Sequence, residues 1–301
     1  MPPPVSELIQ NFQTTHIAAG HSRQTIAWYG ESLTAFFKWL QAEDLHRGDW
    51  LRRDVVEAYL AHAKANGNAP ATVAGKFRAL HGFFGWLTER EYITVSPLAG
   101  MKPPHVPRKP PRRGAVSEFD QLIAAIGQES WVDLRDRLIV NVLFLCGLRR
   151  TECARLVRED FLIGEHLLWV RDGKGGRDRF VPLLPSVERA FIAYLYERPA
   201  HPSERLFLGT DGGGKPVGEL LSGGIYQMVR RRCKAAGMRR VNPHAWRHGL
   251  AMHLLNKGGD MSLVQKILGH SQISTTAKHY AEWLTDGMQR EFAGKMGGVG
   301  A

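Results

Sequence analysis

Histidine and arginine gather in the segment HAWRH at residues 244–248. His244, Arg247 and His248 fall at i, i+3 and i+4, so a helix through this segment would carry all three on one face. A guanidinium flanked by imidazoles can bind an anion and move protons at the same place. A solvated helix face or a histidine satisfied within a core has the same pattern, so this segment alone does not separate the interpretations.

Two further cations stand where the main chain is expected to turn. Arg149 follows Gly147 in LCGLRRTECARL, between the expected end of one helix and the start of the next, for which Thr151 is the expected N-cap. Lys174 lies in DGKGGRD, where glycines on both sides would let it swing over a bound ligand. A solvated surface residue is the alternative for each.

A phenol follows in ILGHSQISTTAKHYAEW, where His270 comes directly after an expected helix end and Ser274 can cap a further helix that carries Tyr280. With the cations, these residues supply guanidinia, a lysine, imidazoles and a phenol, without an acidic set for a metal ion. This inventory is typical of phosphoryl transfer in which arginines neutralise the phosphate, the phenol attacks and a cation protonates the leaving oxygen. The sequence therefore predicts no metal and no cofactor.

The charge balance favours a polyanionic partner. The 301 residues include 40 Lys and Arg against 29 Asp and Glu, a formal net charge of +11, which favours nucleic acid, with an anionic membrane surface as the alternative. No stretch approaches the about 20 apolar residues of a membrane span. The N-terminal segment MPPPVSELIQ lacks the basic region followed by an apolar region that is typical of a signal peptide. Three cysteines without a CxxC pair fit a reducing compartment, so we expect a cytoplasmic protein.

The elements that must position these residues form two groups. Apolar spacing near 3.6 residues predicts four helices within residues 1–101, enough for a small bundle. Residues 102–113, KPPHVPRKPPRR, hold prolines and no acid, which predicts an extended linker that either runs along a phosphate backbone or is a bare connection. The expected DNA contacts of the linker and of the hairpin tip are Lys102, Arg108, Lys109, Arg112, Arg113 and Arg177.

Residues 114–301 make the second expected domain and its C-terminal tail. LLWV and RFVPL predict an antiparallel hairpin, after which the pattern returns to helix. Asn242 and Pro243 suit the N-cap and first position of the HAWRH helix, and Ser262 with Gln265 predicts a capping box for a helix that ends at Gly269. The expected fold class is mainly α with a small antiparallel β-sheet, a helical bundle preceding a mixed α/β domain.

The order of GLRRTE, DGKGGRDRFVPL, HAWRH, LGHS and a following tyrosine resembles the tyrosine recombinases, the family of lambda integrase, Cre and the Xer proteins. The resemblance covers nearly the whole chain and looks closest to the simpler Xer plan. It implies a SAM-like core-binding domain and a catalytic domain of the DNA breaking-rejoining type. It also implies site-specific recombination through a 3′-phosphotyrosyl link, without metal or ATP, by a homo-tetramer on two DNA duplexes, each with a specific recombination site.

The family's roles carry over to the matching positions. Arg149 and Arg247 match the arginines that clamp the scissile phosphate, and Tyr280 matches the nucleophile. Lys174 matches the lysine that protonates the 5′ oxygen, and His244 matches a histidine that assists proton transfer and phosphate binding. The matched catalytic positions are Arg149, Lys174, His244, Arg247, His270 and Tyr280, and the supporting ones are Glu152, His248 and His279.

One spacing departs from the family pattern, in which the tyrosine is the ninth residue after the histidine of LGH. Here His279 is ninth and Tyr280 is tenth, which would turn a helical side chain by about 100°. Three interpretations are open: the loop at 271–274 takes up the extra residue, a bulge in the helix absorbs it, or His279 is the attacking group. Two further functions stay open, a type IB topoisomerase-like relaxation of DNA and a non-catalytic DNA-binding regulator.

Overall fold

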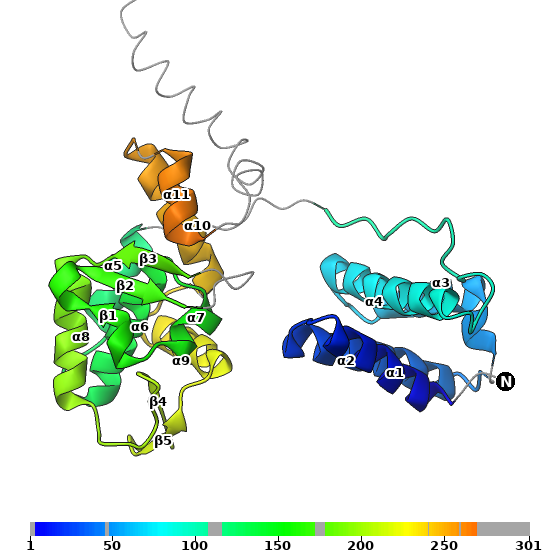
Figure 1. The fold of residues 1–301 in the computed structure, drawn as a ribbon, viewed down its shortest axis with the longest axis horizontal. Coiled ribbons are helices and arrows are strands. Elements are labelled where there is room, and N and C mark those ends of the chain that lie inside the picture. The colour runs from blue at the N-terminus through cyan, green and yellow to red at the C-terminus, as the bar shows by residue number, and fades with distance from the viewer. Residues whose placement is uncertain are drawn as a thin grey trace, which may run out of the picture. The chain divides into compact units, whose positions relative to one another are not determined.

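The structure is a computed structural model that describes residues 4–45, 48–107, 116–171, 178–239, 241–258 and 260–269. The chain divides into two units, Met1–Pro110 and Pro111–Ala301, each with its own hydrophobic core. Figure 1 shows the helices of the first unit in blue to cyan and the elements of the second in green to orange. No helix in the described ranges has the length and apolar character needed to cross a membrane.

The first unit is helical in its described residues. Its helices are α1 Val5–Ala18, α2 Arg23–Ala42, α3 Arg53–Ala65 and α4 Pro70–Glu89, with a short 3₁₀ turn at Asp49–Leu51. Each helix buries one apolar stripe, and aromatic rings fill much of the space between them, as where Phe12 of α1 meets Phe83 of α4 at 5.4 Å between ring centroids. The predicted helical bundle is confirmed.

The second unit combines helices with two small antiparallel sheets in its described residues. Its helices are α5 Val116–Ala125, α6 Trp131–Phe144, α7 Arg150–Arg155, α8 Pro185–Glu197, α9 Ser222–Ala235, α10 Pro243–Asn256 and α11 Met261–Leu268. Its strands are β1 Phe161–Leu162, β2 Leu167–Val170, β3 Arg179–Pro182, β4 Leu208–Thr210 and β5 Pro216–Glu219. Helix α6 packs against α8 and α10 and is buried along most of its length. The predicted fold class, mainly α with small antiparallel sheets, is confirmed.

Strands β2 and β3 form the hairpin that LLWV and RFVPL predict. They pair antiparallel from Leu167 opposite Pro182 to Val170 opposite Arg179, and β1 joins β2 as a third strand. The ends of both strands nearest the predicted tip are therefore fixed, while residues 172–177 of the tip lie outside the described residues.

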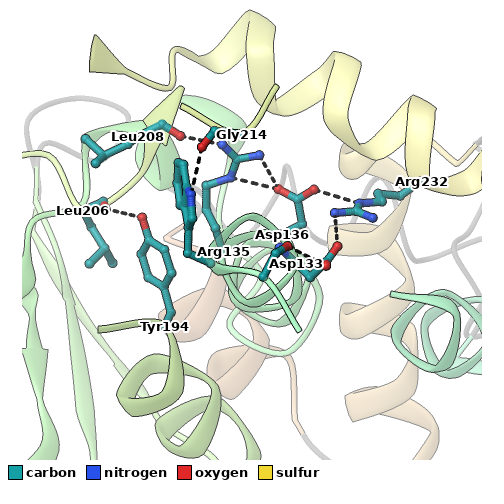
Figure 2. Close-up of polar contacts among 10 residues, drawn as sticks. Asp133, Arg135, Asp136, Tyr194, Leu206, Leu208, Gly214 and Arg232 are labelled. Carbon is teal, nitrogen blue, oxygen red and sulfur yellow. Dashed lines mark hydrogen bonds and ion pairs between the residues drawn. The ribbon is translucent and has the colours of Figure 1, made fainter. Parts of the chain in front are cut away.

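A second hairpin, β4–β5, corrects the expectation that the chain returns to helix after β3. Its register runs from Leu208 opposite Glu219, with an irregularity before Thr210. Side chains of α6 hold it: Arg135 Nη1 donates to the carbonyl of Leu208 at 2.6 Å, and Trp131 Nε1 donates to that of Gly214 at 3.0 Å (Figure 2). Local pattern misses this hairpin because distant side chains, rather than a long apolar alternation, stabilise it.

A buried ion network joins α6 to α9 (Figure 2). Arg135 donates to the Oδ1 atom of Asp136 through Nε at 2.9 Å and Nη2 at 2.7 Å, and both side chains are almost fully buried. Arg232 of α9 donates to Asp136 Oδ2 at 2.8 Å and to Asp133 Oδ1 at 2.6 Å. Because losing one partner would leave a buried charge uncompensated, this network fixes how α9 packs on α6.

Candidate active site

Arg149 stands at the turn between α6 and α7. Helix α6 ends at Phe144, three residues before the glycine expected to end it, and Gly147 has a φ of +62°. That conformation favours glycine, and an added Cβ would lie only 2.7 Å from the Cδ2 atom of Leu268. The turn that precedes Arg149 is therefore pressed against the last residue of α11.

The N-cap of α7 is Arg149, so the expectation that Thr151 caps this helix is wrong. Helix α7 begins at Arg150, which places Thr151 inside its first turn. The Glu152 carboxylate accepts the backbone N–H of Arg149 at 2.8 Å and so satisfies a donor at the start of the helix. Of the two hydrogen bonds of a capping box, the Glu152 carboxylate makes the one to the backbone N–H of the N-cap residue, and this bond needs no Ser or Thr hydroxyl.

The Glu152 carboxylate is the centre of a buried ion cluster. It accepts the Nη1 atom of Arg149 at 2.6 Å and two nitrogens of Arg179 on β3, at 3.1 and 2.8 Å. The side chains of Glu152 and Arg179 are 5% and 8% exposed, whereas that of Arg149 is 25% exposed. One carboxylate therefore holds two guanidinia, and the more open of them is the predicted phosphate ligand.

The guanidinia keep this carboxylate ionised. Burial acts to raise the pKa of Glu152, but the hydrogen bonds and charge of Arg179, followed by those of Arg149, outweigh it and lower the pKa to about 2. Near neutral pH the cluster thus carries one negative and two positive charges, and the net positive charge suits a phosphate.

Arg247 joins α10 to the same turn. The helix begins as predicted, with the Asn242 side chain accepting the N–H of His244 at 3.1 Å and Pro243 at its first position. Arg247 is 3% exposed, and its terminal nitrogens donate to the carbonyls of Gly147 and Leu268. The structure therefore brings the second predicted arginine to the backbone two residues before Arg149.

The two histidines of HAWRH differ in burial from the arginine between them. His244 is exposed and His248 is half-buried, and their rings meet edge to face with centroids 4.7 Å apart. A wholly solvated face therefore does not describe this segment, because Arg247 points to the interior while His244 reaches solvent.

Helix α11 ends where predicted but begins with a different cap. Asp260 is its N-cap and accepts the N–H of Leu263 at 2.7 Å, so the capping box of Ser262 and Gln265 is wrong. An aspartate carboxylate directly before the helix reaches these donors as well as a serine hydroxyl would. Gly269, with a φ of +61°, ends the helix as expected.

The remaining predicted residues fall into two groups. Lys102 is described and is exposed. Those outside the described residues are Arg108, Lys109, Arg112, Arg113, Lys174, Arg177, His270, His279 and Tyr280. Of the predicted set, the structure brings together Arg149, Glu152 and Arg247, and the three interpretations of the extra residue before Tyr280 stay open.

Sequence reasoning missed Arg179. Its contacts with Glu152 join residues 27 positions apart, and its Nε atom donates at 2.9 Å to the carbonyl of Ile267, 88 positions away. A usable signal was present, because side chains two apart on a strand share a face and Val181 is buried. An arginine on the inward face of a strand needs an internal partner.

Comparisons with known proteins place this chain in a family. Residues 115–285 match the model of the "Phage integrase family", and residues 9–91 match that of the "Phage integrase, N-terminal SAM-like domain". Tyrosine recombinase XerA of Thermococcus kodakarensis is 32% identical over 274 residues, which cover 90% of this chain and 89% of the relative. Tyrosine recombinase XerD of Listeria monocytogenes is 27% identical over 282 residues, covering 90% and 93%.

Solved structures agree on the fold. The crystal structure of XerH site-specific recombinase bound to palindromic difH substrate, a post-cleavage complex, aligns with a TM-score of 0.69 at 21% identity and covers 92% of this chain and 81% of the other. The crystal structure of XerA recombinase aligns with a TM-score of 0.50 at 26% identity, over 92% and 93%. With the family model matching more than half of its length, the chain belongs to the phage integrase family.

Proposed function

We propose that this chain is a site-specific DNA recombinase of the tyrosine type, which cleaves and rejoins DNA without metal or ATP. The observation that carries the proposal is the convergence of two predicted phosphate ligands on one turn. Arg247 donates to the carbonyl of Gly147, and Arg149, two residues on, is held by Glu152. The relatives named as tyrosine recombinases support it, as does a relative solved with its difH substrate.

The proposed reaction exchanges one phosphoester for another. The Tyr280 oxygen attacks the scissile phosphorus, a bond forms between them, and the bond from phosphorus to the 5′ oxygen breaks. Lys174 donates a proton to that leaving oxygen, and the proton that the Tyr280 phenol loses passes to His244 or His270. Attack by a 5′ hydroxyl on the 3′-phosphotyrosyl link reverses these steps and releases the tyrosine, so no external energy source is needed.

The arginines stabilise the charge that develops in the transition state. A guanidinium donates two parallel N–H bonds to phosphate oxygens, and Arg149 and Arg247 would bind the non-bridging oxygens in this way. Because the Glu152 cluster fixes the partly exposed Arg149 side chain before DNA arrives, little reorganisation of that side chain is needed at the moment of reaction.

The proposed partner is double-stranded DNA with a specific recombination site. Strand exchange between two duplexes needs a catalytic centre at each cleaved strand, so we propose that four copies of the chain assemble on two duplexes. We propose that the protein acts in the cytoplasm.

A nicked suicide substrate tests the proposal, because the short fragment released by cleavage diffuses away and prevents rejoining. The wild-type chain is expected to form a covalent complex that survives denaturation. Arg247→Lys, which keeps the charge and loses the planar fork, is expected to slow its formation about 10²- to 10³-fold. Arg232→Lys, in the network of α6 and α9, is the matched control and is expected to cleave at the wild-type rate.

Two outcomes would contradict the proposal. A reversible mobility shift without any covalent product would favour a DNA-binding regulator. Relaxation of supercoiled plasmids that lack a recombination site, at the rate seen with the site, would favour a topoisomerase.

A further inference from the structure

We propose that Arg179 is a positioning residue for DNA cleavage: it fixes Arg149 through the Glu152 carboxylate and at the same time fixes the end of α11. The inference rests on the proposed function, since cleavage is the step it concerns. It adds to the predicted catalytic positions a residue that does not itself touch the phosphate but sets the positions of Arg149 and of the end of α11.

The first link runs from β3 to α7. Arg179 presents its two terminal nitrogens to the two oxygens of Glu152, at 3.1 and 2.8 Å, a side-by-side fork that leaves the carboxylate one orientation. In that orientation Glu152 accepts both the backbone N–H and the Nη1 atom of Arg149. Arg179 therefore holds the Arg149 guanidinium indirectly, through Glu152.

The second link runs from β3 to α11. The Nε atom of Arg179 donates at 2.9 Å to the carbonyl of Ile267, in the last turn of the helix, where carbonyls lack helical partners. Gly269 permits this approach, because a Cβ there would lie 2.9 Å from the Cδ atom of Arg179. His270, a predicted catalytic residue, follows Gly269 directly in sequence.

The electrostatics of the cluster require the same residue. The hydrogen bond and charge of Arg179 are the largest of the effects that lower the pKa of Glu152 against the opposing effect of burial. The thiols of Cys146 and Cys153 also face the cluster, but burial raises the pKa of both, so they are neutral. The charged groups that share a surface hollow with Glu152 are Arg155, Asp160, Arg171 and Arg205.

Lysine cannot replace this arginine. A lysine ammonium is a single point of charge at the end of a flexible stem, so it cannot form the fork to Glu152 and the bond to Ile267 together. Arg179→Lys thus removes the fork to Glu152 and keeps the positive charge, whereas Arg179→Gln removes both. Arg232→Lys is a matched control, because Arg232 belongs to a separate carboxylate network of the same unit.

The test measures DNA affinity and single-turnover cleavage of the suicide substrate from about pH 5 to about pH 8, well below the thermal midpoint of each variant. Both Arg179 variants are expected to bind DNA within about twofold of the wild type and to cleave about 10- to 100-fold more slowly. The rate of Arg179→Gln is expected to fall further toward acid pH, because Glu152 protonates more readily there. The cleavage rate of the double variant Arg179→Gln, Glu152→Gln is expected to fall by less than the product of the two single-variant reductions.

A merely structural arginine would lower the thermal midpoint and leave the rate and its pH profile unchanged. That result, or wild-type cleavage by Arg179→Lys, would overturn the inference. So would a loss confined to DNA affinity, which would make Arg179 a DNA contact.

A second readout does not depend on cleavage. The amide resonance of Arg149, whose N–H donates to Glu152, reports the titration of that carboxyl group. In Arg179→Gln this titration is expected to move to higher pH than in the wild type, and an unmoved titration would overturn the inference. If the wild-type chain forms no covalent complex, the proposed function fails while this resonance still decides whether Arg179 holds Glu152.

Discussion

At the scale of single residues, the charge of Glu152 decides how Arg149 is held. The carboxylate is 5% exposed and contacts two guanidinia, so its protonation would leave both without their shared partner. Arg247 is held differently, by backbone carbonyls of Gly147 and Leu268, which do not titrate. The two predicted phosphate ligands therefore differ in how they respond to acid.

Glu152→Gln tests the contribution of this charge to stability. Because the pKa of Glu152 is lowered from 4.5 to about 2 on folding, its ionised form stabilises the folded chain above pH 4.5, and this contribution is lost as pH falls toward 2. The wild type is expected to lose about 3 kcal/mol more than the variant over that range. Urea unfolding at a series of pH values measures it, and parallel pH dependences would contradict the assigned pKa.

The residues of the site were predictable to the extent that motif order carries them. Arg149, Glu152 and Arg247 follow from GLRRTE and HAWRH, and the structure places them around one turn. Arg179 was not predicted, because its partners are distant in sequence and a strand arginine beside a basic hairpin tip resembles a solvated residue. Its place two residues before the buried Val181 signals that it faces inward, but no local pattern names Glu152 and Ile267 as its partners.

At the scale of elements, the turn between α6 and α7 is the meeting point of the site. Helix α10 reaches it through Arg247, and α11 reaches it through Leu268, which packs against Gly147. Strand β3 adds Arg179, which contacts both α7 and α11. Short elements from three parts of the second unit are therefore fixed to each other by two arginines and one glycine.

Gly147→Ala tests the packing of this turn. The new Cβ would meet Leu268 at 2.7 Å and Leu250 at 2.9 Å, in a backbone conformation that alanine disfavours. We expect a loss of about 2–4 kcal/mol in unfolding free energy, since overpacking adds to the backbone strain, together with slower cleavage. Gly237→Ala is the control, with a φ of +63° and nothing within 4 Å, and an equal loss in both variants would contradict the packing argument.

Elements with strong local patterns were predicted and those stabilised at a distance were not. The four helices of the first unit and the β2–β3 hairpin follow from apolar spacing. The β4–β5 hairpin was missed because Arg135 and Trp131 of α6 hold it. The caps of α7 and α11 were misassigned because Glu152 and Asp260, carboxylates near each helix start, compete with the hydroxyls that the sequence also offers.

At the scale of the whole molecule, the basic surplus is the property that matters for DNA. A net charge of +11 favours contacts with phosphates, and each contact releases counterions, so affinity falls as salt rises. Between about 50 and 200 mM salt the affinity of the wild type for its site is expected to fall by roughly 10³-fold or more.

The linker supplies a defined share of that dependence if it follows the DNA backbone. Replacing Arg108, Lys109, Arg112 and Arg113 by glutamine is expected to lower the salt slope of log K by about one for each phosphate contact removed. Fluorescence anisotropy over a salt series measures the slope. An unchanged slope would show that residues 102–113 are a bare connection between the two units.

The identity of the residue that becomes attached to DNA tests most directly whether Tyr280 is the nucleophile. After cleavage of a suicide substrate, nuclease and protease digestion leave a nucleotide-linked peptide that mass spectrometry can sequence. We expect a 3′-phosphate link on Tyr280 and no covalent complex from Tyr280→Phe. A link on His279, or a covalent complex that persists in Tyr280→Phe, would contradict it.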